Sequence, residues 1–358
     1  MTTRREFLGG SAALLGLSMT SSLQAQADEQ LSFLFLGGTG FIGPHQINYA
    51  LDRGHKVTMF NRGRNSGLYG DRVEELVGNR DANIDGGLKV LEGNRTWDVV
   101  IDNSGYVPRH VRDSAQLLKG RCTRYIFTST TAVYDYDKTP SVDHTSPMYS
   151  IFPDTEEVNG DTYGPLKAEC DQIVQDVFGD KATIIRPTVI VGPGDSSDRF
   201  TYWVDRFHRG GDIVCPSPRN EAAWIDARDL CHFIVSLGER DVPGIYLGTG
   251  PASVVTNRDV MMGFRAFSSA PVNLHWLTPA LTEEMEFNPP WMWSGTKERH
   301  MDASASVAAG MTYRSLATSI QDTWDWWQAQ PAERRANPRR WPTAEQEMAV
   351  IARLKSSA

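Results

Sequence analysis

The sequence predicts an α/β protein, a doubly wound parallel sheet with a smaller C-terminal substrate domain. Short apolar segments alternate with segments of helical length, as in strand–helix–strand crossovers. The first apolar segment, 31–36, runs directly into a glycine-rich turn at 37–43. A buried strand that ends in such a turn is typical of a phosphate-binding site at the start of a helix. The 358 residues suffice for one large or two modest domains.

The predicted strands occupy the first half of the chain, at 31–36, 56–60, 90–91, 99–101, 125–128 and 182–185. A first helix at 41–53 has apolar residues at helical spacing and stops at a glycine. From about residue 193 the alternation of strand and helix segments becomes irregular. We therefore expect a sheet domain at 28–192 and, at 193–358, mostly a substrate-binding or lid region that returns to the core near 224–247. Asp226 and Arg228 are expected to fix this lid rather than to react.

Residues 1–27 resemble an export signal and are left out of the fold prediction. Arg4-Arg5 form a basic start, an apolar stretch follows, and Ala25-Gln26-Ala27 has the small residues of a cleavage site. The apolar stretch is too short and too rich in Gly and Ser to span a bilayer comfortably. We expect export by the twin-arginine route, to the periplasm or beyond, with no stable membrane span after processing. An uncleaved anchor and a chance arginine pair are the alternatives.

Composition excludes several classes of protein. The formal net charge of −8 and the pI near 5.5 argue against a surface that coats nucleic acid or binds anionic membranes. The four cysteines are widely spaced and form no metal-ligand pattern, so no metal site is expected. Cys122 and Cys231 lie in apolar or mixed segments and are expected to be packed thiols.

The turn at 37–43 predicts a dinucleotide site. Gly37 allows the tight turn, Gly40 lets the backbone approach a pyrophosphate, and Gly43 lets the helix pack closely on the sheet. The free N–H groups at the helix start then face the phosphates. The cofactor-binding residues predicted here are Gly37, Thr39, Gly40, Phe41, Ile42 and Gly43. A glycine-rich turn without a ligand is the alternative.

The end of the second strand bears on which cofactor binds. An acidic residue there binds the ribose hydroxyls of NAD, whereas a basic residue accommodates the extra phosphate of NADP. The chain has Asn61-Arg62-Gly63-Arg64 at this point, with no acid. Asn61 and Arg62 are therefore predicted to contact the cofactor, NAD or NADP, with NADP favoured. Solvated loop arginines are the alternative interpretation.

Hydroxyl and amine groups follow in two further segments. Tyr163 and Lys167 lie four residues apart at the start of a predicted helix, and therefore on one face of it. A tyrosine is a poor base, because its usual pKa is about 10. A neighbouring cation and a positively charged nicotinamide would stabilise its phenolate. After the fifth strand, Ser129 and Thr130 expose hydroxyls where a substrate would lie.

Four features in this order resemble the extended short-chain dehydrogenase/reductases of the NAD-dependent epimerase/dehydratase group, over about residues 31–247. They are the glycine turn, the hydroxyl-rich strand end before Val133-Tyr134, the Tyr-x-x-x-Lys pair, and the segment Arg186-Pro187-Thr188-Val189-Ile190-Val191-Gly192-Pro193-Gly194-Asp195. The resemblance implies a Rossmann fold.

The resemblance also implies roles for individual residues. Tyr163 would be the acid/base that exchanges a proton with the substrate. Lys167 would lower the pKa of that tyrosine and hold the nicotinamide ribose. Thr130 would hydrogen-bond the reacting oxygen, with Ser129 as the alternative.

Two positions depart from the pattern of that group. The acid after the second strand is missing, and the Gly-Asp expected after the third strand is replaced by Gly93-Asn94-Arg95. Both departures leave the choice between NAD and NADP less well determined by the sequence. They make this part of the chain look closer to the atypical relatives, which are isoflavone-reductase-like or chloroplast RNA-binding.

The resemblance implies an enzyme that transiently oxidises a sugar-like or other secondary alcohol with a tightly bound cofactor. Such a cycle restores its own cofactor and therefore suits an exported protein. The alternatives are an NADPH-dependent carbonyl reductase and a non-catalytic NAD(P)-binding sensor of the same fold. The partner is expected to be a small molecule, carbohydrate-like and without a nucleotide, and the family commonly forms homodimers.

Overall fold

The computed structural model describes residues 27, 29–285, 287, 290, 299–339 and 341–356. Apart from Ala27, the expected export signal lies outside these residues. Within the described part of the chain, no helix has both the length and the apolar character needed to cross a bilayer.

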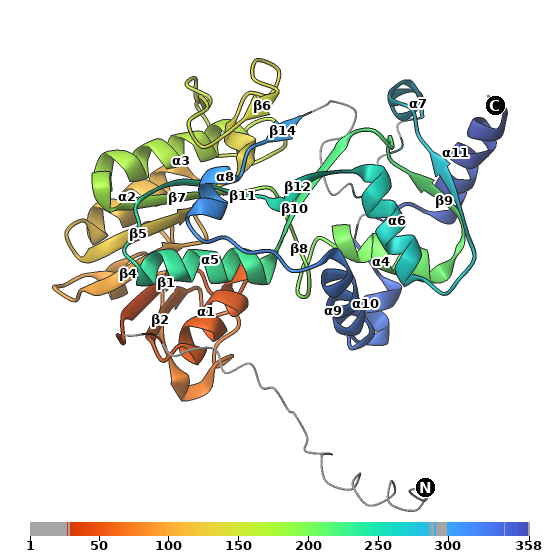
Figure 1. The fold of residues 1–358 in the computed structure, drawn as a ribbon. Helices are drawn as coiled ribbons and strands as arrows, with labels where there is room; N and C mark the ends of the chain where they lie inside the picture. Colours follow the sequence, from red (N-terminus) through yellow and green to blue (C-terminus); the bar gives the residue numbers. More distant parts are fainter. Residues whose placement is uncertain are drawn as a thin grey trace, which may run out of the picture.

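A seven-stranded parallel sheet forms the first lobe, as the sequence predicts (Figure 1). Its strands lie in the order β11-β7-β5-β4-β1-β2-β3, and each neighbouring pair is parallel. Such an order requires crossover connections, which the intervening helices supply. The strands are β1 (Ser32–Leu36), β2 (Lys56–Asn61), β3 (Val73–Val77), β4 (Trp97–Asp102), β5 (Cys122–Thr128), β7 (Ala182–Pro187) and β11 (Gly244–Gly248).

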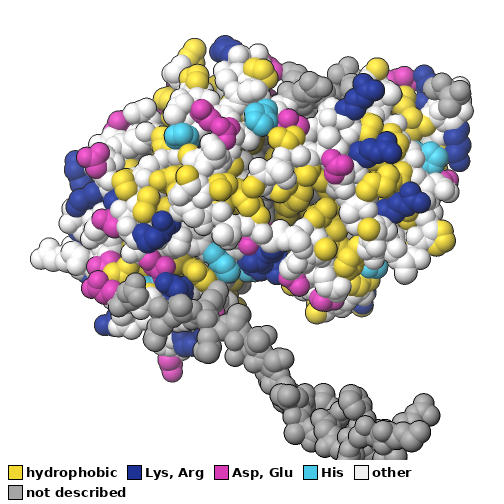
Figure 2. All heavy atoms as spheres, in the orientation of Figure 1, with side chains coloured by type: hydrophobic (Ala, Val, Ile, Leu, Met, Phe, Trp, Pro, Cys, Tyr) yellow, Lys and Arg dark blue, Asp and Glu magenta, His cyan; other side chains and the backbone are white. Residues whose placement is uncertain are grey.

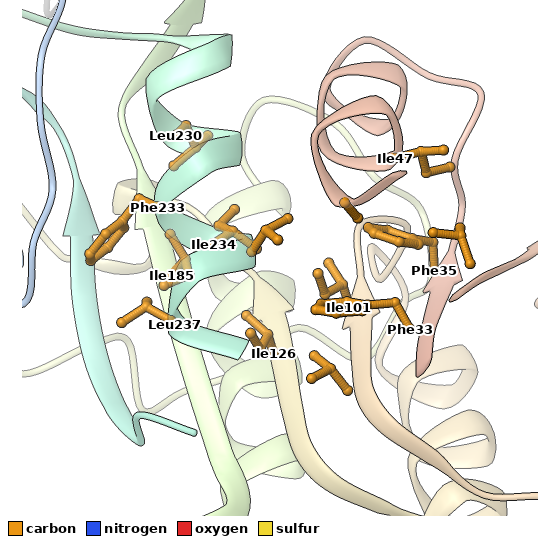
Figure 3. Close-up of a cluster of buried hydrophobic side chains, with 14 of the residues drawn as sticks. Phe33, Phe35, Ile47, Ile101, Ile126, Ile185, Leu230, Phe233, Ile234 and Leu237 are labelled. Carbon is orange, nitrogen blue, oxygen red and sulfur yellow. The ribbon is translucent and has the colours of Figure 1, made fainter. Parts of the chain in front are cut away.

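Alternating side chains of β1 anchor the helices on both faces of the sheet. Phe33 and Phe35 pack toward the face covered by α1 and α5, where apolar side chains from both helices and from the parallel strands meet (Figure 3). Leu34 and Leu36 belong to the core of the opposite face, which α2 and α3 cover. All four are fully buried, and burial of each contributes about 1.5–3 kcal/mol. The helices are α1 (Ile42–Asp52), α2 (Pro108–Leu118), α3 (Tyr163–Phe178) and α5 (Ala227–Glu239).

The third strand is not where the sequence predicted it. Residues 89–91 form a short 3₁₀ turn, and the strand beside β2 is β3. Two adjacent glutamates, Glu74 and Glu75, hid this strand, because consecutive acids are unusual in a buried strand. At the sheet edge they are tolerated, since the Glu74 carboxylate can reach outward to accept hydrogen bonds from Thr58 and Arg95.

The second lobe is built on two small sheets. β8 (Val189–Val191) pairs with β10 (Glu221–Asp226), which pairs with β12 (Gly250–Thr256), and β9 (Gly211–Cys215) pairs with β13 (Val272–Trp276). Aromatic side chains such as those of Phe200, Trp203 and Phe207 fill its core. Its helices are α4 (Arg199–Arg209), α6 (Asn257–Phe267), α7 (Pro279–Glu284), α9 (Leu316–Gln328), α10 (Ala332–Ala336) and α11 (Ala344–Ser356).

The chain crosses back to the first lobe twice after residue 193. In the first crossing, β11 joins the parallel sheet beside β7, and α5 packs on one face of that sheet. The second places β14 (His300–Met301) beside β6 (Ser141–Val142) and is followed by α8 (Ser304–Ala308). Cys122 and Cys231 are free and buried.

Asp226, at the end of β10, joins the two lobes. Its carboxylate pairs with Arg228 of α5 at 2.7 Å and with Arg314 at 3.4 Å, and it accepts a hydrogen bond from Ser319 of α9 at 2.7 Å. Burial alone would raise the pKa of Asp226, but the hydrogen bonds and the two guanidinium charges lower it below its usual value. The network is structural, as the sequence led us to expect of Asp226 and Arg228.

We predict that Asp226→Asn lowers the unfolding free energy by about 3 kcal/mol, because two partly buried guanidiniums lose a buried charged partner. Differential scanning calorimetry should show a melting temperature lower by several degrees, whereas the exposed control Asp52→Asn should match the wild type. Because the folded pKa is lowered, this stabilisation is present above about pH 4, the usual carboxyl pKa, and is lost at lower pH. A difference between variant and wild type that persists unchanged into acid would contradict this assignment.

Candidate active site

A cavity of about 1250 Å³ lies at the carboxyl ends of the parallel strands and is closed on its far side by the second lobe. This is the place where open parallel sheets bind their ligands. The structure brings every residue predicted for the site into the lining of this one cavity, namely Gly37, Thr39, Gly40, Phe41, Ile42, Gly43, Asn61, Arg62, Ser129, Thr130, Tyr163 and Lys167.

The glycine turn has the shape that a pyrophosphate requires. Gly37 has a φ of +83°, which side-chain-bearing residues rarely adopt. A Cβ at Gly43 would lie 2.5 Å from the backbone of Gly38, so only glycine permits this packing of α1 against the turn. A Cβ at Gly40 would meet no atom within 4 Å, so the backbone here faces open space. The turn is therefore tightly packed where Gly43 meets Gly38 and open to a ligand at Gly40.

The end of β2 carries no acid in the cavity. The Asn61 amide donates to Glu75 of β3 at 2.7 Å, which fixes Asn61 at the rim. Arg62 is exposed and lines the cavity together with Arg64. A basic rim at this position can accept an additional phosphate on an adenine ribose.

The end of β3 contributes three residues that the sequence prediction missed. Gly78, Asn79 and Arg80 line the cavity, whereas Arg95, from the segment predicted to follow the third strand, pairs with Glu74 outside it. Both segments contain the letters Gly-Asn-Arg, so the motif alone could not distinguish them. The available signal was the set of apolar residues Val73, Leu76 and Val77 immediately before the first of the two copies.

Arg80 is held by a buried carboxylate behind the cavity wall. Two of its nitrogens donate to the Asp102 oxygens at 2.7 and 2.9 Å, and the Tyr125 hydroxyl donates to the same carboxylate at 2.9 Å. Asp102 is fully buried at the end of β4. The pair therefore neutralises itself and joins β4 to the segment after β3.

Tyr163 lies at the first position of α3 and interacts with Thr130. Burial raises the pKa of the Tyr163 phenol to about 12, while a hydrogen bond with Thr130 and the charge of Arg199 act in the opposite direction. The resting residue is thus a neutral phenol that can donate a proton. Thr130 immediately precedes a 3₁₀ turn, and its hydroxyl also accepts the N–H of Ala132 at 3.2 Å.

Lys167 is buried one helical turn further along α3. Its ammonium donates to the backbone carbonyls of Gly105 and Thr128 at 2.7 and 2.9 Å and lies 4.0 Å from the centre of the Phe127 ring. Burial lowers the pKa of Lys167. The sequence led us to expect that this cation would lower the pKa of Tyr163. In the structure the Thr130 hydroxyl and the Arg199 charge lower it, and Lys167 also binds the two carbonyls; the effect of Lys167 on Tyr163 stays a prediction.

A buried ion pair aligns these elements behind the site. Arg186 of β7 donates to Asp171 of α3 at 2.9 Å and to the Tyr134 hydroxyl at 2.7 Å. The Ser129 hydroxyl interacts with Asp171 and lowers the pKa of that carboxyl, although burial raises it overall. Ser129 therefore faces the ion pair, and Thr130 is the hydroxyl that interacts with Tyr163.

The site and the fold define a dinucleotide-binding α/β protein of the Rossmann class. Residues 33–247 match the model of the NAD dependent epimerase/dehydratase family, and the chain belongs to that family. Among curated proteins it is 26% identical over 214 residues to the chloroplast stem-loop binding protein of 41 kDa b of Arabidopsis thaliana. It is 25% identical over 192 residues to the UDP-glucose 4-epimerase 4 of Oryza sativa subsp. japonica. The matches cover 55% and 46% of this chain, and the chain spans about half the length of either relative, 52% and 50%.

Solved structures of similar fold carry dinucleotides. The chain resembles the Bordetella bronchiseptica enzyme WbmH in complex with NAD⁺, with a TM-score of 0.63, 15% identity and coverage of 84% and 99% of the two chains. It also resembles the UDP-glucuronic acid 4-epimerase of Bacillus cereus in complex with NAD (TM-score 0.61, 15% identity, 83% and 98%). A human epimerase family protein, SDR39U1, bound to NADPH has a TM-score of 0.57 at 18% identity and coverage of 82% and 99%. At sequence identities of 15% to 18%, these similarities show a shared fold and no more.

The residues present fit a dinucleotide. Open space over Gly40 leaves room for a pyrophosphate, and the helix start behind it supplies N–H groups. Of the three N–H donors of the Lys167 ammonium, two bind backbone carbonyls, so one more can reach a ribose hydroxyl. The cavity therefore offers contacts for the phosphates and for one ribose.

We predict that two glycine substitutions separate folding from binding. Gly43→Ala forces a Cβ into the Gly38 backbone and should lower the melting temperature. Gly40→Ala should leave the melting temperature near that of the wild type, yet weaken NADP binding about tenfold or more, because the methyl group occupies space over the pyrophosphate site. Thermal unfolding and calorimetric titration with NADP measure the two effects. Equal loss of stability in both variants would contradict this division.

Proposed function

We propose that this protein is an NAD(P)-dependent epimerase or dehydratase that transiently oxidises a secondary alcohol of a sugar-like small molecule, using a tightly held cofactor. The observation that carries the proposal is the contact of Thr130 with Tyr163 in the cavity that also contains the glycine turn and Lys167. A nucleotide fold without this chemistry has no need of a hydroxyl pair beside a buried lysine.

Each of the three residues has a distinct task. Thr130 donates a hydrogen bond to the reacting oxygen and fixes its position beside Tyr163. The Tyr163 phenol exchanges a proton with that oxygen, acting as an acid in its resting state. Its deprotonation needs additional positive charge, since burial raises its pKa to about 12. Lys167 holds a ribose hydroxyl and contributes a fixed charge to the same region.

The bound nicotinamide would accept a hydride from the carbinol carbon and return it at the end of the cycle. The chain would thereby keep its cofactor through many turnovers. This property supports the proposal that the protein is exported by the twin-arginine route, because that route carries folded proteins and the compartment outside supplies no fresh cofactor. The basic rim at Arg62 and Arg64 favours NADP over NAD, and a homodimer is the oligomeric state we propose.

The first experiment is to purify the exported protein, denature it and identify any released dinucleotide by chromatography and mass spectrometry. Near-stoichiometric NADP or NAD supports a cofactor loaded before export and a self-restoring cycle. An empty protein that binds NADPH reversibly would support a cytoplasmic carbonyl reductase, and one that binds no dinucleotide would overturn the proposal.

We predict that Tyr163→Phe reduces turnover about a hundredfold or more, which is the usual range for a lost acid/base group. Cofactor binding should stay near that of the wild type, because the phenol hydroxyl is not among the predicted phosphate contacts. Absorbance of the reduced nicotinamide during incubation with a panel of sugars follows the first half-reaction. As a matched control, Tyr246→Phe removes a hydroxyl that donates to the Pro243 carbonyl outside the cavity and should have no effect. Loss of bound cofactor in Tyr163→Phe would show that the site is misplaced.

We predict that Arg62→Ala weakens NADP binding more than NAD binding, because only NADP has a 2′-phosphate for the guanidinium. Removal of a charge-assisted contact of this kind should cost NADP about tenfold in affinity. Arg72→Ala, an exposed substitution outside the cavity, is the control. Equal effects of Arg62→Ala on the two cofactors would refute the phosphate contact.

A further inference from the structure

Tyr106 places an exposed aromatic ring inside the cavity. It lies between β4 and α2, it lines the cavity, and it is 49% exposed. Hydrophobic side chains also reach the surface elsewhere, as Figure 2 shows across the middle of one face of the molecule. Exposure alone therefore does not mark a functional residue. What distinguishes Tyr106 is the pair of residues that its ring contacts.

The fold does not use the Tyr106 hydroxyl. Buried tyrosines of the same lobe spend their hydroxyls on structure, since Tyr69 donates to the Gly38 carbonyl and Tyr125 donates to the Asp102 carboxylate, each at 2.9 Å. Within the part of the chain that the structure describes, the Tyr106 hydroxyl makes no hydrogen bond. The contacts of Tyr106 with the site are therefore those of its ring.

Lys167 is a buried cation that depends on neutral partners. Its ammonium donates to two backbone carbonyls, and none of the described residues that line the cavity is Asp or Glu. Burial lowers the pKa of Lys167, so its charged form needs compensating interactions. Aromatic rings supply them, because the face of a ring attracts a cation that lies within about 6 Å of its centre.

Two rings surround this ammonium. The centre of the Phe127 ring lies 4.0 Å from the Lys167 nitrogen, and the centre of the Tyr106 ring lies 5.5 Å from it. Phe127 is fully buried in β5, whereas Tyr106 lines the cavity. One ring therefore holds the ammonium from the core, and the other holds it from the cavity side.

A glycine places Tyr106 at this position. A Cβ at Gly105 would lie 2.5 Å from the Phe127 ring and 2.7 Å from the Val111 side chain, so only glycine permits this close approach. The Gly105 carbonyl accepts a hydrogen bond from Lys167 at 2.7 Å, and Tyr106 is the next residue. A single short segment thus supplies both a carbonyl and a ring to the same ammonium.

The Tyr106 ring also lies beside the reacting phenol. The ring centres of Tyr106 and Tyr163 are 6.4 Å apart, and the ring planes are inclined by 34°. This separation is within the range of aromatic pairs in proteins. Tyr163 and Lys167 are one turn apart on the same face of α3. Tyr106 therefore packs against both.

We infer that Tyr106 is a positioning residue, whose ring holds the Lys167 ammonium from the cavity side and fixes the Tyr163 phenol beside it. The ring favours the protonated lysine and so preserves the donor that can reach a ribose hydroxyl. The inference rests on the proposed function for the part that Tyr163 plays in turnover. The effect on Lys167 concerns cofactor binding alone and can be measured without turnover.

Other groups also influence the charge of Lys167. After burial, which lowers its pKa, the groups that act on it are Cys170 and Asp171 of α3, Asp102 of β4 and Arg80 after β3. The first three raise the pKa of Lys167, and Arg80 lowers it. A substitution at Tyr106 leaves all four in place, so a change in the titration of Lys167 reports the ring.

The test is a fluorescence titration of the purified protein, freed of any bound dinucleotide, with NADPH between about pH 6 and pH 10. Wild-type affinity should fall at alkaline pH, because Lys167 loses its charge and a donor, whereas Tyr163 stays neutral with its pKa of about 12. In Tyr106→Leu the fall should begin about half a pH unit lower, and NADPH should bind about threefold more weakly at neutral pH. Lys167→Arg, which keeps its charge, should abolish the alkaline fall.

The matched variant Tyr106→Phe keeps the ring and removes the hydroxyl. It should match the wild type in the NADPH titration. With an alcohol that the protein oxidises, Tyr106→Leu should lower kcat about tenfold through misplacement of Tyr163, and Tyr106→Phe should restore it. Phe152→Leu, an exposed aromatic substitution outside the cavity lining, is the control and should change neither measurement. Melting temperatures check that each variant is folded.

Two results would overturn the inference: an NADPH titration of Tyr106→Leu that is identical to that of the wild type, or equal changes in Tyr106→Leu and Tyr106→Phe. Tyr163→Phe separates these outcomes from the proposed function. A ring-dependent shift in NADPH binding, together with full turnover in Tyr163→Phe, refutes the proposed mechanism and leaves the contact of Tyr106 with Lys167 in place.

Discussion

The candidate site depends on one buried ion pair, Arg186 with Asp171. It connects β7 to α3, and through the Tyr134 hydroxyl it also holds the segment that begins with Thr130. Both charges are almost fully buried, so removal of either partner would leave the other unpaired at a cost of about 3–5 kcal/mol. The pair thus fixes α3, which carries Tyr163 and Lys167, relative to the hydroxyls of the opposite wall.

Two kinds of wall enclose the cavity. The glycine turn and the strand ends form a rigid wall, because Gly43 packs on the Gly38 backbone and the sheet is buried on both faces. The opposite wall consists of segments that the second lobe and the C-terminal part supply, anchored at single residues such as Asp198. The rigid wall therefore suits a cofactor, whereas the segments of the opposite wall are the part of the cavity that can shape a substrate site.

Burial disfavours the phenolate form of Tyr163 in this structure. It raises the pKa of Tyr163 to about 12, and Lys167 is held by backbone carbonyls. The acid-free lining works in the other direction, since every fixed charge on it favours a phenolate. The positive charge of the lining therefore offsets part of the effect of burial on the Tyr163 phenol.

The sequence by itself determined the parallel sheet, most of its strands, the glycine turn and the set Thr130, Tyr163 and Lys167. These depend on local periodicity and on motifs whose spacing is fixed by backbone geometry. It failed at β3, because two glutamates at a sheet edge disguise a strand and Gly-Asn-Arg occurs twice. Only the tertiary structure decided which copy of Gly-Asn-Arg enters the cavity, that Ser129 faces Asp171, and that Arg299 and Arg339 line the same cavity as the glycine turn. Contacts between residues so distant in the chain follow from packing of the two lobes, which no local pattern encodes.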